Sequence, residues 1–103
     1  MIGSKDFMSV SFDQKLVVTE DTLINVIEGE SVILNLKSES YFGLDQVGTR
    51  MWDALTSSDS IQTAYEKLLN EYDVSADKLK EDLSDLIGKL LANGLLEARD
   101  GKS

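Results

Sequence analysis

Carboxylates are the side chains of this sequence that could act as acids, bases or metal ligands. The chain has 19 Asp and Glu residues among 103, but Asp53, Glu66 and Asp85 stand at ordinary exposed positions of predicted helices. General acid/base catalysis needs a carboxyl group within hydrogen-bonding reach of the proton it moves. No spacing in the sequence pairs these residues into such a site, so we interpret them as solvated surface charges.

The sequence contains neither histidine nor cysteine. This excludes the usual structural zinc site, thiol nucleophiles, histidine-based acid/base catalysis and disulfide bonds. Most enzyme classes are therefore disfavoured. We expect a protein that is not an enzyme and that uses no cofactor and no metal ion.

The segment Asp59-Ser60-Ile61 offers one alternative function. It is similar to the Asp-Ser-Leu site at which acidic carrier proteins receive phosphopantetheine, and Ser60 would be the attachment point. Carrier proteins are helical bundles, however, whereas residues 23–44 have the pattern of a sheet. A helix-capping role explains Asp59 and Ser60 without further assumptions, so the carrier function is the weaker interpretation.

Residues 41–44 offer main-chain hydrogen bonds instead of side-chain chemistry. In a simple meander this Tyr-Phe-Gly-Leu run would be an edge strand, and it contains neither lysine nor proline. An edge strand has unpaired N–H and C=O groups that accept another strand, and Gly43 has no side chain to obstruct it. An extended peptide is therefore a candidate ligand, with pockets on the helix side selecting alternate side chains.

Three short strands are predicted to position this run. They are β-branched and aromatic segments separated by polar turns, which predicts a three-stranded antiparallel meander. In the middle strand Val32, Leu34 and Leu36 alternate with more polar positions, so we expect their face to be buried. A short strand at 16–18 and an extended piece at 95–96 are also predicted. The three main strands are residues 23–27, 32–36 and 41–44.

After residue 44 the hydrophobic period changes to that of helices. Asp45 is placed to cap the first helix, the polar cluster 56–60 breaks it and caps the second, and Ser75 is placed to cap the third. Asn93-Gly94 supplies a left-handed stop. The fold class is therefore α+β: a three-stranded antiparallel β-meander followed by three α-helices, in a winged helix-turn-helix-like arrangement.

The length fits one domain. We predict it at residues 14–98, between a flexible N-terminal segment (1–13) and a flexible C-terminal tail (99–103). The sequence has no signal-peptide pattern and no run of 18 apolar residues. We therefore expect a cytoplasmic protein that does not associate with a membrane.

This order of parts resembles the PqqD-like family of small recognition domains. The resemblance covers about residues 14–97 and depends on several motifs taken together. The Tyr-Phe-Gly-Leu strand followed by Gly-Thr-Arg-Met-Trp is more similar to the stand-alone members of lasso-peptide pathways than to those of pyrroloquinoline quinone synthesis. The matching segments are 41–45, 48–55, 65–74 and 81–96.

The resemblance implies a non-catalytic function. Family members bind the leader of a ribosomally made precursor peptide as an extra strand beside the third strand, in a groove walled by the third helix. They present the peptide to a modifying enzyme, as a recognition element or peptide chaperone. On this sequence a helical wheel places the groove wall on one flank of the third helix. The predicted peptide-binding residues are Tyr41, Phe42, Gly43, Leu44, Leu79, Asp82, Leu86 and Lys89.

Charge bears on the partners. A formal net charge of −9 opposes the phosphate neutralisation on which nucleic-acid affinity depends, so a winged-helix DNA-binding function is the less favoured alternative. Partners with basic or apolar groups suit this surface better.

Trp52 is expected in the core. The oligomeric state stays open between monomer and homodimer, since an unfilled edge can pair with a second copy and Leu91 could mark a dimer surface.

Overall fold

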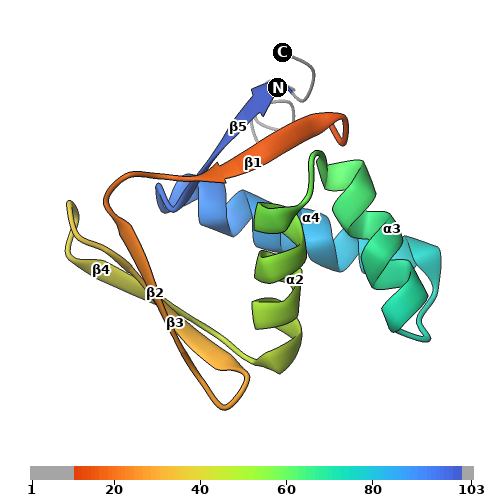
Figure 1. Ribbon diagram of the computed structural model, residues 1–103, viewed down its shortest axis with the longest axis horizontal. Coiled ribbons are helices and arrows are strands. Elements are labelled where there is room, and N and C mark those ends of the chain that lie inside the picture. The colour runs from red at the N-terminus through yellow and green to blue at the C-terminus, as the bar shows by residue number, and fades with distance from the viewer. Residues whose placement is uncertain (1–10, 101–103) are drawn as a thin grey trace, which may run out of the picture.

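The computed structural model describes residues 11–100, which form two small antiparallel sheets and three helices (Figure 1). The predicted flexible segments 1–13 and 99–103 lie partly outside this range. The elements in chain order are β1 (Gln14–Val18), β2 (Thr22–Ile27), β3 (Glu30–Asn35), β4 (Ser40–Leu44), α2 (Gln46–Ser57), α3 (Ile61–Glu71), α4 (Ala76–Ala92) and β5 (Leu96–Asp100).

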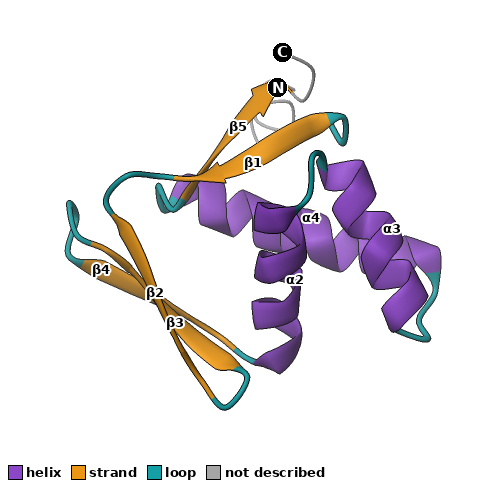
Figure 2. Cartoon of the chain, in the orientation of Figure 1, coloured by secondary structure: helices purple, strands orange, loops and turns teal. Residues whose placement is uncertain are grey.

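The predicted meander is confirmed. Strands β2, β3 and β4 pair antiparallel in that order, and the register places Ile24, Ile33 and Phe42 side by side across the sheet. In Figure 2 this sheet lies on one side of α2, α3 lies on the other side, and α4 passes behind α2. The α+β class and the order of three strands followed by three helices are as the sequence predicts.

The two short extended pieces predicted at 16–18 and 95–96 form a second sheet. Strand β1 pairs with β5 antiparallel, from Gln14 opposite Asp100 to Val18 opposite Leu96. The strand β5 therefore continues two residues beyond the predicted domain limit at 98, into the segment assigned to a flexible tail. Cross-strand pairing fixes this end, and a boundary drawn from apolar pattern alone could not include it.

The predicted flexible N-terminal segment also needs correction at Phe12. Its ring packs edge-on against Tyr65, with the ring centroids 5.8 Å apart, and the Lys80 ammonium lies 5.5 Å from the Phe12 centroid. The Gln62 N–H donates a hydrogen bond to the Phe12 carbonyl at 2.8 Å. An aromatic ring has enough apolar surface to order the chain that carries it, so the packed domain begins before residue 14.

The helices begin, and α4 ends, at the capping residues that the sequence predicts. The side chains of Asp45, Ser60 and Ser75 each accept a hydrogen bond from the backbone N–H three residues later, at 2.8, 3.1 and 3.2 Å. This satisfies one of the N–H groups that a helix start leaves without a partner. Gly94 follows α4 with φ of +71°, the left-handed conformation that glycine adopts without strain.

The core lies between the helices and the inner faces of the two sheets. Trp52 is buried there, as expected, together with apolar residues of every helix. Fully buried side chains of this cluster come from distant parts of the chain, so the sheets and helices share one core. They include Leu16, Ile33, Leu55, Leu68, Leu83, Ile87 and Leu90.

The buried face of β3 is the opposite of the one predicted. Ile33 is 0% exposed and Asn35 is also buried, whereas Leu34 is 37% exposed on the outer face. Asn35 is satisfied inside: its Nδ2 donates to the Asn93 carbonyl at 3.1 Å, and its Oδ1 accepts from the Lys37 N–H at 3.0 Å. A polar residue can be buried when its hydrogen bonds are complete. Val32 and Leu36 share the exposed face with Leu34.

This inversion gives a direct test with two isomeric side chains. We expect Ile33→Ala to lower the free energy of unfolding by about 2–4 kcal/mol, because it leaves a cavity in the core. Leu34→Ala should cost less than about 1 kcal/mol, since a partly exposed side chain loses little burial. Urea denaturation of both variants measures the difference. A larger cost for Leu34→Ala than for Ile33→Ala would mean that the strand is turned the other way.

Candidate functional site

The strand β4 is an edge of its sheet. Among residues 11–100 it pairs with β3 on one side, and no other strand of that range pairs with its second side. Along an antiparallel strand, alternate residues direct both their N–H and C=O groups toward the partner strand or away from it. Every second residue of β4 therefore offers backbone groups to an incoming strand.

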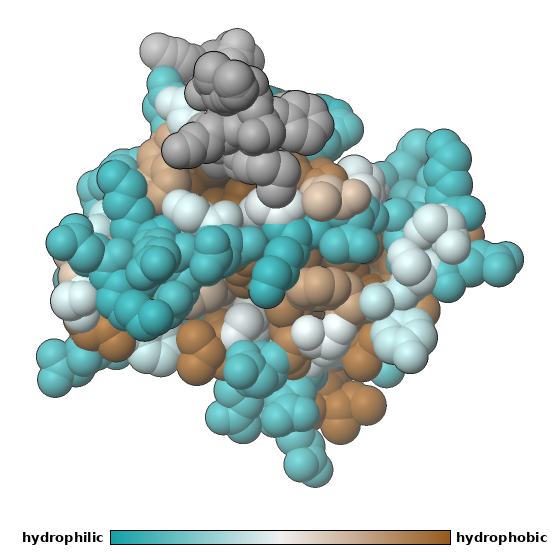
Figure 3. All heavy atoms as spheres, turned by 180° about the vertical axis from the view of Figure 1, so that it is seen from behind, coloured by the Kyte–Doolittle hydropathy of each residue, from teal (hydrophilic) through white to brown (hydrophobic). Residues whose placement is uncertain are grey.

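A groove of about 390 Å³ lies directly beside this edge, between β4, the start of α2 and one flank of α4. Its apolar part comes from all three elements, so no one of them could form the groove alone. Figure 3, which views the molecule from the α4 side, shows hydrophobic atoms interspersed among hydrophilic ones on this face. The apolar lining residues are Phe42, Leu44, Val47, Met51 and Leu86.

Six of the eight predicted site residues line this groove. Phe42, Gly43 and Leu44 come from β4, and α4 contributes the other three. Because they lie about forty residues apart in sequence, the fold alone brings the two sets together. The residues from α4 are Asp82, Leu86 and Lys89.

Tyr41 and Leu79 lie elsewhere. Tyr41 is 75% exposed, and it belongs to the outer row of the sheet with Leu23 and Leu34. Leu79 is only 3% exposed and packs in the core. Placing Leu79 on the groove wall is therefore a correction: it stands two turns before Leu86 on the same stripe, but at its level the stripe is covered by the core.

Sequence reasoning missed the part of the groove that α2 provides. Val47 and Met51 are absent from the predicted site residues, yet Val47 is exposed and both line the groove. A signal was present: Val47 is the first apolar residue of the helix and follows the edge strand after only two residues. The start of a helix joined so closely to an edge strand must lie beside it.

The polar rim of the groove is mainly acidic. Asp45, Asp82 and Asp85 line it together with one cation, Lys89. Asp82 pairs with Lys78 across one helical turn at 3.2 Å, and this hydrogen bond raises the pKa of the Lys78 ammonium. A ligand with basic side chains near the acidic end would be favoured electrostatically.

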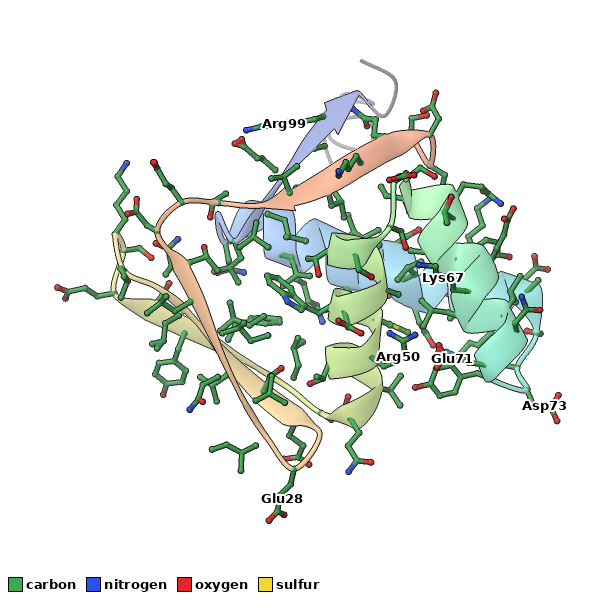
Figure 4. The ribbon with its side chains drawn as sticks, in the orientation of Figure 1. Glu28, Arg50, Lys67, Glu71, Asp73 and Arg99 are labelled. Atoms are coloured by element: carbon green, nitrogen blue, oxygen red, sulfur yellow. The ribbon has the colours of Figure 1, made fainter. Side chains whose placement is uncertain are left out.

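A second group of ion pairs, centred on Arg50, lies outside the groove and consists of side chains in their charged forms. Arg50 of α2 forms a bidentate pair with Glu71 of α3, at 2.9 and 2.6 Å, and also contacts Asp53 at 2.8 Å. Figure 4 shows Arg50 and Glu71 pointing toward one another. The hydrogen bond with Arg50 lowers the pKa of Glu71, and the same bond raises the pKa of Arg50. These shifts favour the charged forms, so the pairs suit a structural role better than acid/base chemistry. We call this connection between α2 and α3, formed by Arg50 with Glu71 and Asp53, the brace.

The brace predicts an acid dependence of stability. Because the pKa of Glu71 is lower in the folded state, its stabilising contribution is present above the unfolded value of 4.5 and is lost as the pH falls through the folded value. We expect wild type to lose more stability than Arg50→Gln when the pH drops from about 6 to about 3. Lys67→Gln, which removes one charge from exposed α3, is the control and should follow wild type. Thermal melts at each pH measure this.

The comparisons with known proteins agree with this geometry. A family model for coenzyme PQQ synthesis protein D (PqqD) matches residues 30–96. The chain belongs to the PqqD family. The match runs from the start of β3 to the start of β5, so it includes the edge strand, the groove and the whole of α4. It confirms the resemblance that the sequence motifs indicate.

Two solved structures are similar to this PqqD-family domain. One is described as TbiB1 in complex with the TbiA(beta) leader peptide: it is 31% identical, has a TM-score of 0.73, and the match covers 79% of this chain and 94% of that one. The other is a lasso peptide synthetase B1 complexed with the leader peptide, at 19% identity and a TM-score of 0.72, covering 81% and 98%. The second likeness concerns the fold alone. No curated protein matched the sequence.

Three further features of the PqqD-family domain concern Ser60, metal binding and membrane spans. The Ser60 hydroxyl accepts a hydrogen bond from the Thr63 N–H and lies 3.1 Å from the Thr63 hydroxyl, so it acts as a helix cap. Within residues 11–100, no three acidic side chains gather in a way that could hold a metal ion. In the same range no helix is long and apolar enough to cross a membrane.

Proposed function

We propose that this domain binds the leader segment of a ribosomally synthesised precursor peptide, as a strand added to β4. The observation that carries the proposal is the open edge of β4 lying directly beside an apolar groove. Backbone hydrogen bonds to the edge would supply affinity without regard to sequence, and the groove would select side chains. The 31% identical structure, whose description names a bound leader peptide, supports this choice of ligand.

An added strand would present alternate side chains to the two faces of the sheet. Those on the inner side would enter the groove and contact Phe42, Leu44 and Leu86, with Asp82 and Lys89 at the rim. Those on the outer side would pass beside Tyr41 and Gly43. In this arrangement Tyr41 keeps a role in binding, whereas Leu79 supports α4 from within the core.

We propose that the domain is not itself an enzyme and that it delivers the bound precursor to a peptide-modifying enzyme. The pairing of Arg50 with Glu71 and Asp53, and the capping role of Ser60, account for these polar groups structurally. The Tyr-Phe-Gly-Leu strand followed by Gly-Thr-Arg-Met-Trp, which resembles the stand-alone members of lasso-peptide pathways, supports assignment to a lasso-type pathway. Since such precursors are made on ribosomes, we place the function in the cytoplasm.

An amide-resolved NMR titration tests this function. The labelled domain is titrated with the leader segment of a precursor peptide encoded beside its gene, and an unrelated acidic peptide serves as control. We expect saturable shifts centred on residues 40–44 and on residues 82–89, with none from the control peptide. Saturable shifts that leave these two segments unchanged would refute strand addition to β4.

A further inference from the structure

The strand β2 forms the second edge of the three-stranded sheet. Among residues 11–100 it pairs only with β3, and it lies on the side away from β4. Its sequence, Thr-Leu-Ile-Asn-Val-Ile, contains neither lysine nor proline, the residues that usually protect an edge from pairing. Its four large apolar side chains are all exposed: Leu23, Ile24, Val26 and Ile27. An edge so apolar needs a covering partner.

A cleft of about 420 Å³ lies beside this edge, between β2 and α2. Ile24 and Val26 point into it from the strand, and Trp52 and Thr49 line it from the helix. The groove beside β4 is lined by other residues of α2, namely Val47, Gly48 and Met51, so the two hollows share no lining residue. The β2 edge therefore combines unpaired backbone groups with its own apolar pocket.

The ends of β2 are acidic. Exposed Glu20 and Asp21 precede the strand, and exposed Glu28 and Glu30 follow it. Figure 4 shows Glu28 at the tip of the β2–β3 hairpin, pointing away from the helices. Acidic groups at both ends of an apolar strand favour a partner whose apolar strand is flanked by basic residues.

The cation at this cleft does not change that charge pattern. Arg50 lines the cleft, but Asp53 and Glu71 both pair with its guanidinium. Asp53 lines the cleft as well, so the cleft wall adds no net positive charge. The acidic groups at the two ends of β2 are therefore not offset by a free cation in the cleft.

We propose that β2 and its cleft form a docking surface for the peptide-modifying enzyme, which adds an apolar strand flanked by Lys or Arg to this edge. The inference rests on the proposed function, in which the leader occupies β4. A domain that binds a peptide at one edge and an enzyme at the other would hold both at the same time. The sheet would then connect the precursor to the enzyme that acts on it.

Charge argues against a second copy of this chain as the occupant. A symmetric pairing of two β2 edges would bring each acidic rim against itself, in a chain whose formal net charge is −9. Like charges placed opposite one another across a strand pair are destabilising. The same rim attracts a basic partner.

Two valine substitutions test the proposal. Val26 is 53% exposed on β2 and Val74 is 47% exposed in the α3–α4 connection, so the two are matched in size and exposure. With saturating leader peptide, the domain is titrated with the modifying enzyme encoded beside its gene. We expect Val26→Lys to weaken enzyme binding at least about tenfold, because it puts a charge into the apolar cleft and adds positive charge beside the partner's basic flanks. Val74→Lys should leave it unchanged.

Leader affinity is measured for the same variants in the absence of the enzyme. Both should bind the leader peptide within about twofold of wild type, because β4 is untouched. If leader binding holds but Val26→Lys binds the enzyme as wild type does, the docking inference is wrong and the proposed function stands. If Val26→Lys loses the leader as well, the leader itself occupies β2, and both assignments of the edges fail.

A charge variant checks the chemistry of the partner. Glu28→Gln combined with Glu30→Gln should weaken enzyme binding by about threefold to tenfold and make it less sensitive to salt, since the attraction to basic groups is reduced. Unchanged affinity and salt dependence would refute a basic partner strand. Sedimentation of the free domain provides a further check, because a dimer that Val26→Lys dissociates would assign the edge to a second copy.

Discussion

Proline substitutions at Phe42 and at Gly43 are expected to have different effects. One of the two should abolish leader binding while the domain stays folded, and the other should unfold the sheet. Neighbouring residues of β4 direct their N–H groups to opposite sides, so one of the two faces β3 and the other faces the open edge. Proline removes the N–H group, and its ring obstructs a strand on that side. The two variants therefore separate folding from binding.

Circular dichroism and urea denaturation identify which proline variant is folded, and calorimetric titration with leader peptide then measures its affinity. We expect a loss of about hundredfold or more, since both a hydrogen bond and the close approach of the strand are lost. Gly43→Ala is the control for folding: a Cβ there would meet nothing within 4 Å in the free domain, so the fold should persist. A folded proline variant that binds the leader as wild type does would remove the basis for strand addition at β4.

The features that the sequence predicted well are local ones. Asp45, Ser60 and Ser75 cap helices through hydrogen bonds to groups three residues away, and Gly94 ends α4 through its own backbone conformation. Such signals need no knowledge of the rest of the fold. The meander and the three helices follow from them and from the hydrophobic period.

The errors arose where distant contacts decide the outcome. Both faces of β3 carry apolar residues, and the buried face contains Asn35, whose side chain donates a hydrogen bond to the Asn93 carbonyl, 58 residues away in sequence. The β1–β5 pairing and the packing of Phe12 on Tyr65 likewise join distant segments. Sequence periodicity alone contains none of these contacts.

The candidate site shows the same division. A helical wheel selected the flank of α4 on which Asp82, Leu86 and Lys89 all line the groove. It could not separate Leu86 from Leu79, because residues seven apart lie on nearly the same face of a helix. Leu86 faces the groove and Leu79 faces the core because of the point at which α4 passes β4. That point is a property of the assembled fold.

Leu86→Ala is expected to weaken leader binding about tenfold, because an apolar residue in the middle of a binding groove is placed to act as an anchor for the peptide. Leu86 is half-buried, so its exposed part is available to a ligand while the rest packs on the core. Truncation would remove contact with the leader without unfolding the helix. The loss in folding free energy should be about 1–2 kcal/mol, less than for a fully buried leucine.

Leu91 of the same helix provides the matched control. It is also half-buried against the core, but it does not line the groove. We expect Leu91→Ala to cost similar stability and to leave leader affinity within about twofold of wild type, because distant sites act independently. Calorimetric titration and urea denaturation of both variants separate binding from stability. If the two lose leader affinity equally, α4 acts through its stability and not as the wall of the groove, and selection would then come from β4 and α2.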